Sequence, residues 1–199
     1  MRCIEQDSLG RRRSVYGLSN VLPVSEHCFI ETIESCILNC PTPFNIQSAR
    51  IAVLFNQSHL ILWSTVWEAL KNLVTSKQSA ASKRKIEAFS KASGTILFFE
   101  DKKALTALKK QFPQYAKNMR LWTQQANGML QYMVWQTMAE NDVGASLQHY
   151  NELIEDKISD LFHLPKTWEL VAQMPFGAVE SEPKAKTFLP VEERLIILH

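Results

Sequence analysis

Three short segments of this chain carry residue types that together could hold a phosphorylated, planar molecule. An arginine triplet followed by serine occupies residues 11–14, and Lys184 and Lys186 lie near the other end of the sequence. Guanidinium, ammonium and hydroxyl groups form the strong charge-assisted hydrogen bonds that phosphate oxygens accept. Between these cationic segments, Asn45 and Gln47 present amide edges, which donate and accept in one plane and suit a flat heterocycle.

Each segment taken singly also has an ordinary structural explanation. Adjacent arginines on a loop, or two lysines in an extended segment, are more often solvent-exposed charges than ligands of an anion. Asn45 and Gln47 can equally satisfy a turn and cap the strand that follows. Only the combination of the three segments therefore points to a cofactor.

Other kinds of functional site lack their sequence signatures. The six glycines are scattered singly, no Gly-x-Ser-x-Gly motif appears, and the five histidines have no zinc-ligand spacing. Cys36 and Cys40, one helical turn apart, could bind a soft metal together with Cys28 or His27. Because they share an apolar stripe with Phe29, buried core thiols are the preferred interpretation. We assign no metal site and no catalytic side chain.

The composition is that of an ordinary globular protein. The 199 residues are 46% hydrophobic and 21% charged, which fits a single domain over residues 1–199. A formal net charge of +2 gives no general attraction to nucleic acid or to an anionic membrane. The sequence has neither an apolar run long enough for a membrane span nor a secretory signal. Cysteines at positions 3, 28, 36 and 40 predict free thiols and a cytoplasmic location.

The first half of the chain predicts helices and a pair of strands. Ser25 can cap a helix that runs to about Asn39, after which Pro41 and Pro43 hold the chain extended. Two short apolar runs, RIAVLF over residues 50–55 and LILWST over residues 60–65, are typical of paired strands. A helix over residues 66–76 should follow, and the polar stretch 77–85 is expected to be a mobile loop with solvated lysines.

The second half predicts the centre of the fold. Thr95–Phe99 has the pattern of a buried central strand, and Asp101 can cap the short helix after it. The longest helix is expected over residues 114–140, with a second half that is apolar nearly all round and so lies in a core or at a dimer seam. Further elements are expected as an Asn151-capped helix and as strands over residues 168–174 and 195–198. Together they predict the α+β class with one central sheet.

Five segments resemble, in order, those of the FMN-dependent nitroreductase family. They are RRRSVY, PTPFNIQSAR, SGTILFFED, RLWTQQANGMLQYMVWQTMAENDVGASLQHYN and MPFGAVESEPKAKTF. The chain is most similar to the compact branch, which contains fungal fatty-acid-repression-mutant proteins and bacterial copper-induced nitroreductases. The resemblance implies a nitroreductase-like fold with a mostly antiparallel sheet flanked by helices. It also implies an obligate homodimer, with the long buried helix at the dimer seam and FMN in clefts between the subunits.

The resemblance also assigns cofactor-binding positions. One subunit contributes the first loop, the stretch beside flavin N5 and the phosphate-closing lysines: Arg12, Arg13, Ser14, Tyr16, Ser146, Leu147, Gln148, His149, Lys184 and Lys186. The partner contributes a turn and one helix residue: Pro41, Thr42, Pro43, Asn45 and Gln125. Gln47, in the same turn, is kept as a binding residue for its amide edge.

The activity that the resemblance implies is the reduction of flat, electron-poor acceptors such as nitroaromatics or quinones. NADH or NADPH and the acceptor would use the same flavin face in alternation, which gives ping-pong kinetics. The alternative is a non-catalytic flavoprotein in redox or stress sensing, because it needs the same contacts. Nucleic-acid binding is disfavoured by the charge balance.

Tyr16 departs from the family pattern. It stands where many relatives place a lysine near the N1–O2 edge of the flavin. Loss of that cation should lower the reduction potential, unless Lys85 or Arg84 replaces it. The insertion that covers the cleft in many relatives is also missing, which predicts an open site.

Overall fold

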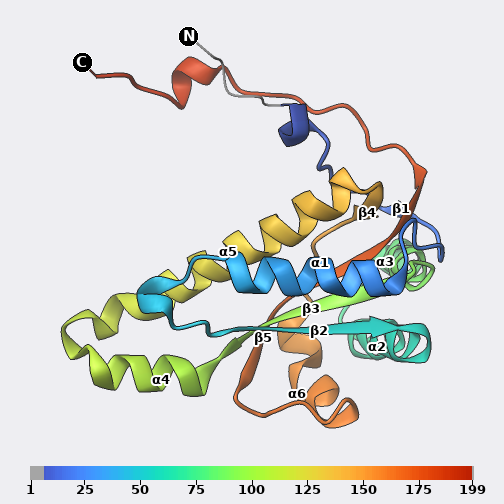
Figure 1. Ribbon diagram of the computed structural model, residues 1–199. Coiled ribbons are helices and arrows are strands. Elements are labelled where there is room, and N and C mark those ends of the chain that lie inside the picture. The colour runs from blue at the N-terminus through green and yellow to red at the C-terminus, as the bar shows by residue number, and fades with distance from the viewer. Residues whose placement is uncertain (1–6, 199) are drawn as a thin grey trace.

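The computed structural model describes residues 7–198, which form an α+β fold around one sheet (Figure 1). The strands are β1 Gly17–Leu18, β2 Ala49–Phe55, β3 Gly94–Asp101, β4 Val143–Ala145 and β5 Trp168–Ser181. The helices are α1 Glu26–Asn39, α2 Asn56–Leu70, α3 Ser76–Ser90, α4 Lys102–Gln111, α5 Ala116–Glu140 and α6 Asn151–Leu161. Short 3-10 turns are η1 Asp7–Gly10, η2 Pro43–Asn45, η3 Pro113–Tyr115 and η4 Val191–Glu193.

The sheet has the strand order β1-β5-β3-β2, β4 also pairs with β5, and every one of these pairings is antiparallel. β3 lies between β2 and β5 and is buried along its whole length. Ile96 of β3 lies opposite Val53 of β2 and Met174 of β5, so apolar cross-strand pairs stabilise the centre of the sheet. The predicted α+β class and the predicted central strand are confirmed.

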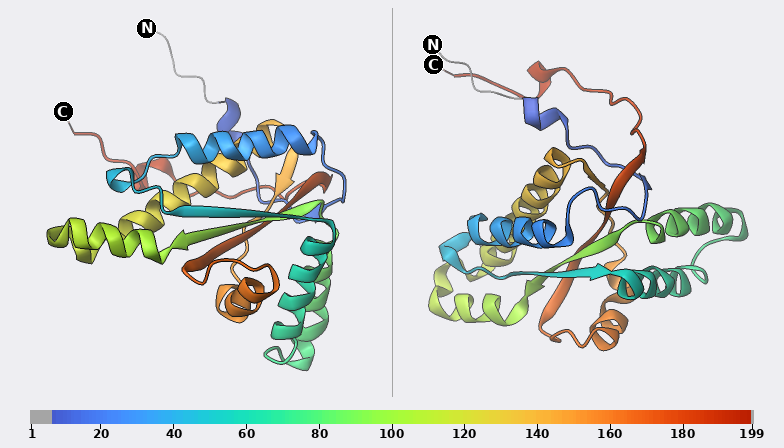
Figure 2. Two further views of the ribbon diagram at one scale, coloured as in Figure 1. Left: turned by 60° about the horizontal axis from the view of Figure 1, so that its bottom comes forward. Right: turned by 45° about the vertical axis from the view of Figure 1, so that its right-hand side comes forward.

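Helices cover both faces of the sheet. Successive residues of a strand point to opposite faces. Ile96 and Phe98 accordingly pack in a core with α1 and α5, whereas Leu97 and Phe99 pack in a second core with α2, α3 and α6. Figure 2 shows these two helical layers on either side of the strands. The two cores fix α5 and α3 on opposite sides of the sheet.

The first predicted helix is confirmed in its position and its cap. Ser25 Oγ accepts a hydrogen bond from the Cys28 N–H at 3.2 Å, and the helix begins at the next residue, Glu26. Cys36 is buried, and burial raises the pKa of its thiol, as expected for a core cysteine. Cys28 is exposed, and Cys3 lies outside the described residues.

The predicted strand pair is wrong in its second member. β2 is followed by helix α2 without an intervening turn, because Asn56 adopts a positive φ of 48° that redirects the chain. The apolar run over residues 60–65 is one face of this helix. The buried residues of α2 have helical spacing: His59, Leu62, Trp63 and Val66.

The polar stretch that was expected to be a mobile loop is helical. α3 begins after Thr75, whose side chain forms a capping box with Gln78. The helix expected over residues 66–76 is therefore the end of α2 and a short turn before α3. Lys83, Arg84 and Lys85 are exposed on α3, which agrees with the interpretation of their charges as a solvated face.

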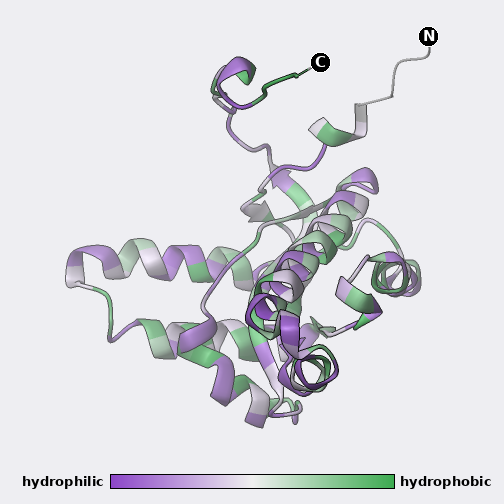
Figure 3. Cartoon of the chain, turned by 90° about the vertical axis from the view of Figure 1, so that its left-hand side faces the viewer, coloured by the Kyte–Doolittle hydropathy of each residue, from purple (hydrophilic) through white to green (hydrophobic). Residues whose placement is uncertain are grey.

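The second half differs from expectation in three places. Asn151 does not cap α6, since Tyr150 is the N-cap and the Asn151 amide instead donates to the Val171 carbonyl at 2.7 Å. β5 continues seven residues beyond the predicted end at Met174 and reaches Ser181. Residues 195–198 form no strand. They belong to an exposed apolar segment that projects from the body of the fold (Figure 3).

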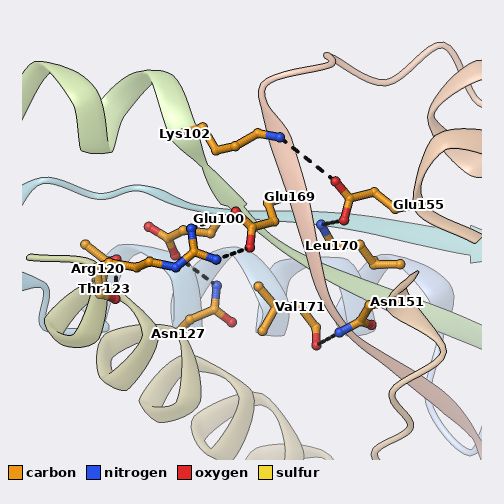
Figure 4. Close-up of polar contacts among 10 residues, drawn as sticks. All are labelled: Glu100, Lys102, Arg120, Thr123, Asn127, Asn151, Glu155, Glu169, Leu170 and Val171. Carbon is orange, nitrogen blue, oxygen red and sulfur yellow. Dashed lines mark hydrogen bonds and ion pairs between the residues drawn. The ribbon is translucent and has the colours of Figure 1, made fainter. Parts of the chain in front are cut away.

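The long helix expected over residues 114–140 is α5, which is about 37 Å long at 1.5 Å per residue. Polar contacts tie its first half to the sheet (Figure 4). Asn127 donates to the Phe99 carbonyl at 2.9 Å, and Arg120 donates to the Glu169 carboxylate at 3.3 Å through Nη1. Its second half packs in the core shared with α1. These contacts hold α5 against the sheet and against α1, and the candidate binding residues lie near its two ends.

Candidate functional site

The first loop runs as extended chain beside β4. The Val15 N–H donates to the Ala145 carbonyl at 2.8 Å, and Ser14 forms a bridge with Ala145. Val15 is buried, whereas Tyr16 is exposed and Ser14 is partly exposed. Because side chains alternate in extended chain, Arg12, Ser14 and Tyr16 lie on the accessible side.

The segment after β4 passes directly beside this loop. Ser146 and Gln148 are buried, and their side chains bond to each other at 3.1 Å, so neither side chain points toward a ligand. The Gln148 N–H donates to the Gln173 carbonyl at 2.7 Å. His149 alternates with these residues and is exposed, whereas Leu147 is partly buried against the core that contains α1 and α5. The Leu147 N–H makes no hydrogen bond within residues 7–198 and is available to a ligand.

The third segment is joined to the first by a hydrogen bond. Arg13 donates from Nη2 to the main-chain carbonyl of Lys184. The Lys184 and Lys186 side chains are exposed. Arg13 also lines a cavity of about 640 Å³ together with Arg11 and other residues on the far side of the loop. Arg13 therefore contacts the backbone of the lysine segment. Of these arginines, Arg12 is the one whose side chain lies on the accessible side of the loop.

Arg12 lies over an aromatic ring at the end of α5. Its guanidinium carbon is 4.4 Å from the centre of the Trp135 ring, a cation–π contact. The contact fixes the position of the Arg12 guanidinium over the Trp135 ring. We call Arg12, Ser14, Leu147 and Lys184 the cationic half-site.

A second cluster forms around η2. Thr42 Oγ1 accepts from the Gln47 N–H at 3.1 Å, and the Arg50 guanidinium donates to the Gln47 carbonyl at 2.6 Å. Phe44, Asn45 and Gln47 have positive φ values of 53°, 53° and 51°. The expectation of an extended segment after Pro41 is therefore wrong, because side-chain bonds hold a left-handed turn there. Pro41, Asn45 and Gln47 are exposed on this turn, and Pro43 begins it.

The turn lies against the first half of α5, beside the exposed Gln125. The Cys40 thiol donates to the Ala126 carbonyl at 3.6 Å, and the Phe44 and Trp122 rings are 6.3 Å apart. We call Thr42, Asn45, Gln47 and Gln125 the amide half-site.

The two half-sites are far apart in one chain. Trp122 marks the amide half-site and Trp135 the cationic one, and the thirteen helical steps from one to the other span about 20 Å. Figure 1 shows η2 near the start of α5 and β4 near its end. A single chain therefore does not bring all sixteen predicted positions together.

Two features of the site were not foreseen from the sequence. Gln173 is fully buried in β5 and orders the segment after β4, since its side-chain oxygen accepts from the Tyr150 N–H at 2.7 Å. Gln173 is the polar residue within the apolar run LVAQMPF, and this pattern could have indicated a buried polar side chain in the strand. Phe44 stacks on Phe112 at 4.5 Å from a left-handed backbone, and no sequence pattern indicated this pairing.

Comparison with known proteins identifies the class. A model described as the nitroreductase family matches residues 9–178, and the chain belongs to this family. The Saccharomyces cerevisiae protein HBN1 is 29% identical over 184 residues, covering 92% of this chain and 91% of the relative. The nitroreductase FRM2 of the same yeast is 27% identical over 185 residues, covering 92% of each chain. The predicted family is confirmed.

Solved structures agree with this assignment. The nitroreductase CinD from Lactococcus lactis, in complex with chloramphenicol, superposes with a TM-score of 0.89 at 36% identity, over 97% of this chain and 98% of CinD. A Desulfovibrio desulfuricans protein solved with FMN has a TM-score of 0.72 at 16% identity over 98% of both chains, and this likeness concerns the fold alone. The chain thus has the nitroreductase fold, and its family supports oxidoreductase activity on nitro compounds. Within residues 7–198, no helix has the length and hydropathy needed to cross a bilayer.

Proposed function

We propose that this chain is an FMN-dependent oxidoreductase that uses NADH or NADPH to reduce nitroaromatic or quinone-type acceptors. The observation that carries the proposal is the hydrogen bond from Arg13 to the Lys184 carbonyl, which joins the lysine segment to the loop that carries Arg12 and Ser14. Converging cations and a hydroxyl donor are what a phosphate monoester requires.

The hydrogen-bond donors of the cationic half-site fit a phosphate. Arg13 Nε and Trp135 Nε1 are buried and have no hydrogen-bond partner within the described residues. Buried donors are seldom left without an acceptor, and the Trp135 ring lies under the Arg12 guanidinium, so this donor favours an acceptor group bound beside Arg12. Arg12, Ser14, Lys184 and Lys186 would hold the phosphate of FMN, and solved relatives in complex with FMN support that choice of cofactor.

The ring of the cofactor would lie along Leu147. The free N–H of this residue is a main-chain donor that can orient the N5 edge of a flavin without a side-chain acid. When bound, FMN supplies the hydride chemistry itself. The chain's own residues bind, orient and shield it, which is why no catalytic side chain is assigned.

We further propose that the site is completed by a second copy of the chain. The amide half-site is about 20 Å from the cationic one, so a two-fold dimer that places α5 against its symmetry mate would bring one copy's amides to the other's cations. α5 has a suitable surface, because Leu121, Met129 and Tyr132 are exposed at helical spacing. The exposed apolar C-terminal segment offers further contact area.

The acceptor class follows from the site and from relatives. CinD has been solved with 4-nitrophenol and with chloramphenicol. A flat aromatic acceptor would stack on a flavin face that the short connections of this chain leave open. The single-domain organisation and the cytoplasmic location remain predictions from the sequence.

The test is an absorption spectrum of the purified protein, followed by anaerobic NADH or NADPH and then a nitroaromatic or a quinone. An oxidised-flavin spectrum that bleaches with nucleotide and returns with acceptor would support the enzyme. Bound flavin that bleaches with neither nucleotide would favour the sensing alternative. A protein that cannot be reconstituted with FMN would overturn both.

A further inference from the structure

Arg50, the second residue of β2, bonds to the turn that carries the amide half-site. Its Nη1 donates to the Gln47 carbonyl at 2.6 Å and to the Ala49 carbonyl at 3.0 Å. Its Nη2 donates to Asp101 Oδ2 at 2.9 Å. A planar guanidinium presents several donors in fixed directions, so this one side chain joins the end of the turn to the Asp101 carboxylate.

Asp101, at the end of β3, is itself held in place by the main chain around it. Its N–H donates to the Ser48 carbonyl at 2.9 Å, and its Oδ1 accepts from the Lys103 N–H at 3.0 Å as the N-cap of α4. Only 11% of the Asp101 side chain is exposed, and 31% of the Arg50 side chain. The carboxylate that binds Arg50 is therefore fixed to both β3 and α4.

The turn depends on this anchor because its backbone is strained. Phe44, Asn45 and Gln47 have left-handed conformations, which residues with a side chain adopt at a cost in free energy. The main chain of Gln47 is held from two sides, since Thr42 Oγ1 accepts from its N–H and Arg50 donates to its carbonyl. Loss of Arg50 would free that carbonyl, and the turn could then relax. The exposed Asn45 and Gln47 amides would lose their fixed directions.

We propose that Arg50 is a positioning residue for the FMN site of the partner subunit. Paired with Asp101, it holds the amide half-site in the conformation that contacts the flavin. This inference rests on the proposed function, in which the amide half-site of one subunit meets the cationic half-site of the other. Within residues 7–198 the Arg50 side chain donates to Gln47, Ala49 and Asp101, so it acts through the turn. Its effect should appear in the site to which its own chain contributes the amides.

The chain offers a matched control in a second arginine–carboxylate pair (Figure 4). Arg120 of α5 donates to the Glu169 carboxylate of β5 through both terminal nitrogens. Glu169 lies opposite Glu100, the residue before Asp101, so both pairs are at the same end of the sheet. Arg120 joins α5 to β5, whereas Arg50 joins the turn to β3. Loss of either arginine removes one ion pair, but only loss of Arg50 releases the turn.

The experiment compares Arg50→Gln, Arg50→Lys and Arg120→Gln in the full-length dimer. The dissociation constant for FMN and the urea midpoint of unfolding are measured for each variant. We expect Arg50→Gln to weaken FMN binding about tenfold, as for the loss of one charge-assisted hydrogen bond, and Arg120→Gln to stay within about twofold of the parent. Arg50→Lys keeps a charge beside Asp101 but lacks the guanidinium fork. It should keep the parental urea midpoint and still bind FMN more weakly.

Mixed dimers distinguish an effect on the partner's site from an effect within one chain. One mixed dimer carries Arg50→Gln in one chain, and Arg12→Ala with Lys184→Ala in the other. A second carries all three changes in one chain, opposite an unchanged chain. We expect the first to bind one FMN per dimer at the parental affinity, because one of its sites has both halves intact. The second should have no site of parental affinity.

Two results would overturn the assignment while leaving the proposed function intact. One is an equal FMN affinity for Arg50→Gln and Arg120→Gln, which would reduce Arg50 to a general contribution to stability. The other is the reverse pattern in the mixed dimers, which would place the effect of Arg50 on the cofactor of its own chain. A parent protein that binds no FMN would instead refute the proposed function.

Discussion

The Arg13 guanidinium donates to the main-chain carbonyl of Lys184, and this bond joins residues that are 171 positions apart. It holds the lysine segment beside the first loop, whose next residue, Ser14, faces the accessible side. The cationic half-site therefore depends on an arginine that lies behind it.

Replacing Arg13 by glutamine should weaken FMN binding by about tenfold or more. A hydrogen bond from a charged donor contributes about 1.5–3 kcal/mol, and each 1.4 kcal/mol is tenfold in affinity. Freed from its anchor, the lysine segment should also be cut faster by trypsin. Arg11→Gln is the matched control, since Arg11 lines the same cavity. Equal FMN affinities in the two variants would show that the anchor is irrelevant to binding.

Replacing Arg12 and Lys184 together by alanine should release FMN and leave a folded dimer. The two side chains are accessible, so their loss removes charge-assisted bonds to phosphate without opening a cavity in the core. Flavin content after gel filtration and the circular dichroism spectrum measure the two effects. Retention of stoichiometric FMN would contradict the phosphate assignment.

Replacing Met129 or Tyr132 by glutamate should dissociate the dimer. Both side chains are exposed on α5 in the single chain, so a carboxylate there is tolerated by the subunit but not at an apolar seam. Met133 and Trp135 are less suitable positions, because they pack against the subunit's own core. Sedimentation at several concentrations distinguishes monomer from dimer, and an unchanged dimer would place the seam elsewhere.

Stability should fall as the pH drops below about 6.5. His59 is buried, with Nδ1 2.9 Å from Thr95 Oγ1 and Nε2 3.2 Å from the Ser90 carbonyl. Burial lowers its pKa below the ordinary value of 6.5, although the Ser90 carbonyl opposes the shift. The unfolded chain therefore takes up this proton at a higher pH than the folded chain does. The stabilisation is complete above 6.5 and is lost between that value and the lowered pKa.

Urea unfolding between about pH 5 and pH 7.5 measures this dependence. A His59→Gln variant should show a smaller change across the range, whereas replacement of the exposed His149 should leave the change as it is. The same slope in the parent and in His59→Gln would assign the dependence to other groups.

The sequence predicted the centre of the fold better than its surroundings. Thr95–Phe99 and α5 carry strong apolar patterns that only one kind of element satisfies. LILWST was misread because five of its six residues are apolar or β-branched, and such a run fits a strand and one face of a helix equally well. The positive φ of Asn56 starts a helix directly after β2, and no pattern in the sequence indicates this backbone conformation.

The candidate site residues could be named from the sequence where a motif contains them, whereas their arrangement in space could not. Arg12 and Ser14 stand in a recognisable segment, as does Asn45. That Arg13 bonds to main chain, and that Asn45 lies at the opposite end of α5 from Arg12, depends on tertiary packing. No local pattern encodes such long-range geometry.

The central claim is that one FMN site needs the cationic half-site of one subunit and the amide half-site of another. It is tested most directly by mixing two defective chains, one with Arg12→Ala and Lys184→Ala, the other with Asn45→Ala and Gln125→Ala. Each homodimer should bind FMN poorly. A heterodimer, purified through two different tags, contains one site with both halves intact and should bind one FMN per dimer at the parental affinity. If both halves instead acted within one chain, every site in the heterodimer would be defective, and failure to recover binding would contradict the shared site.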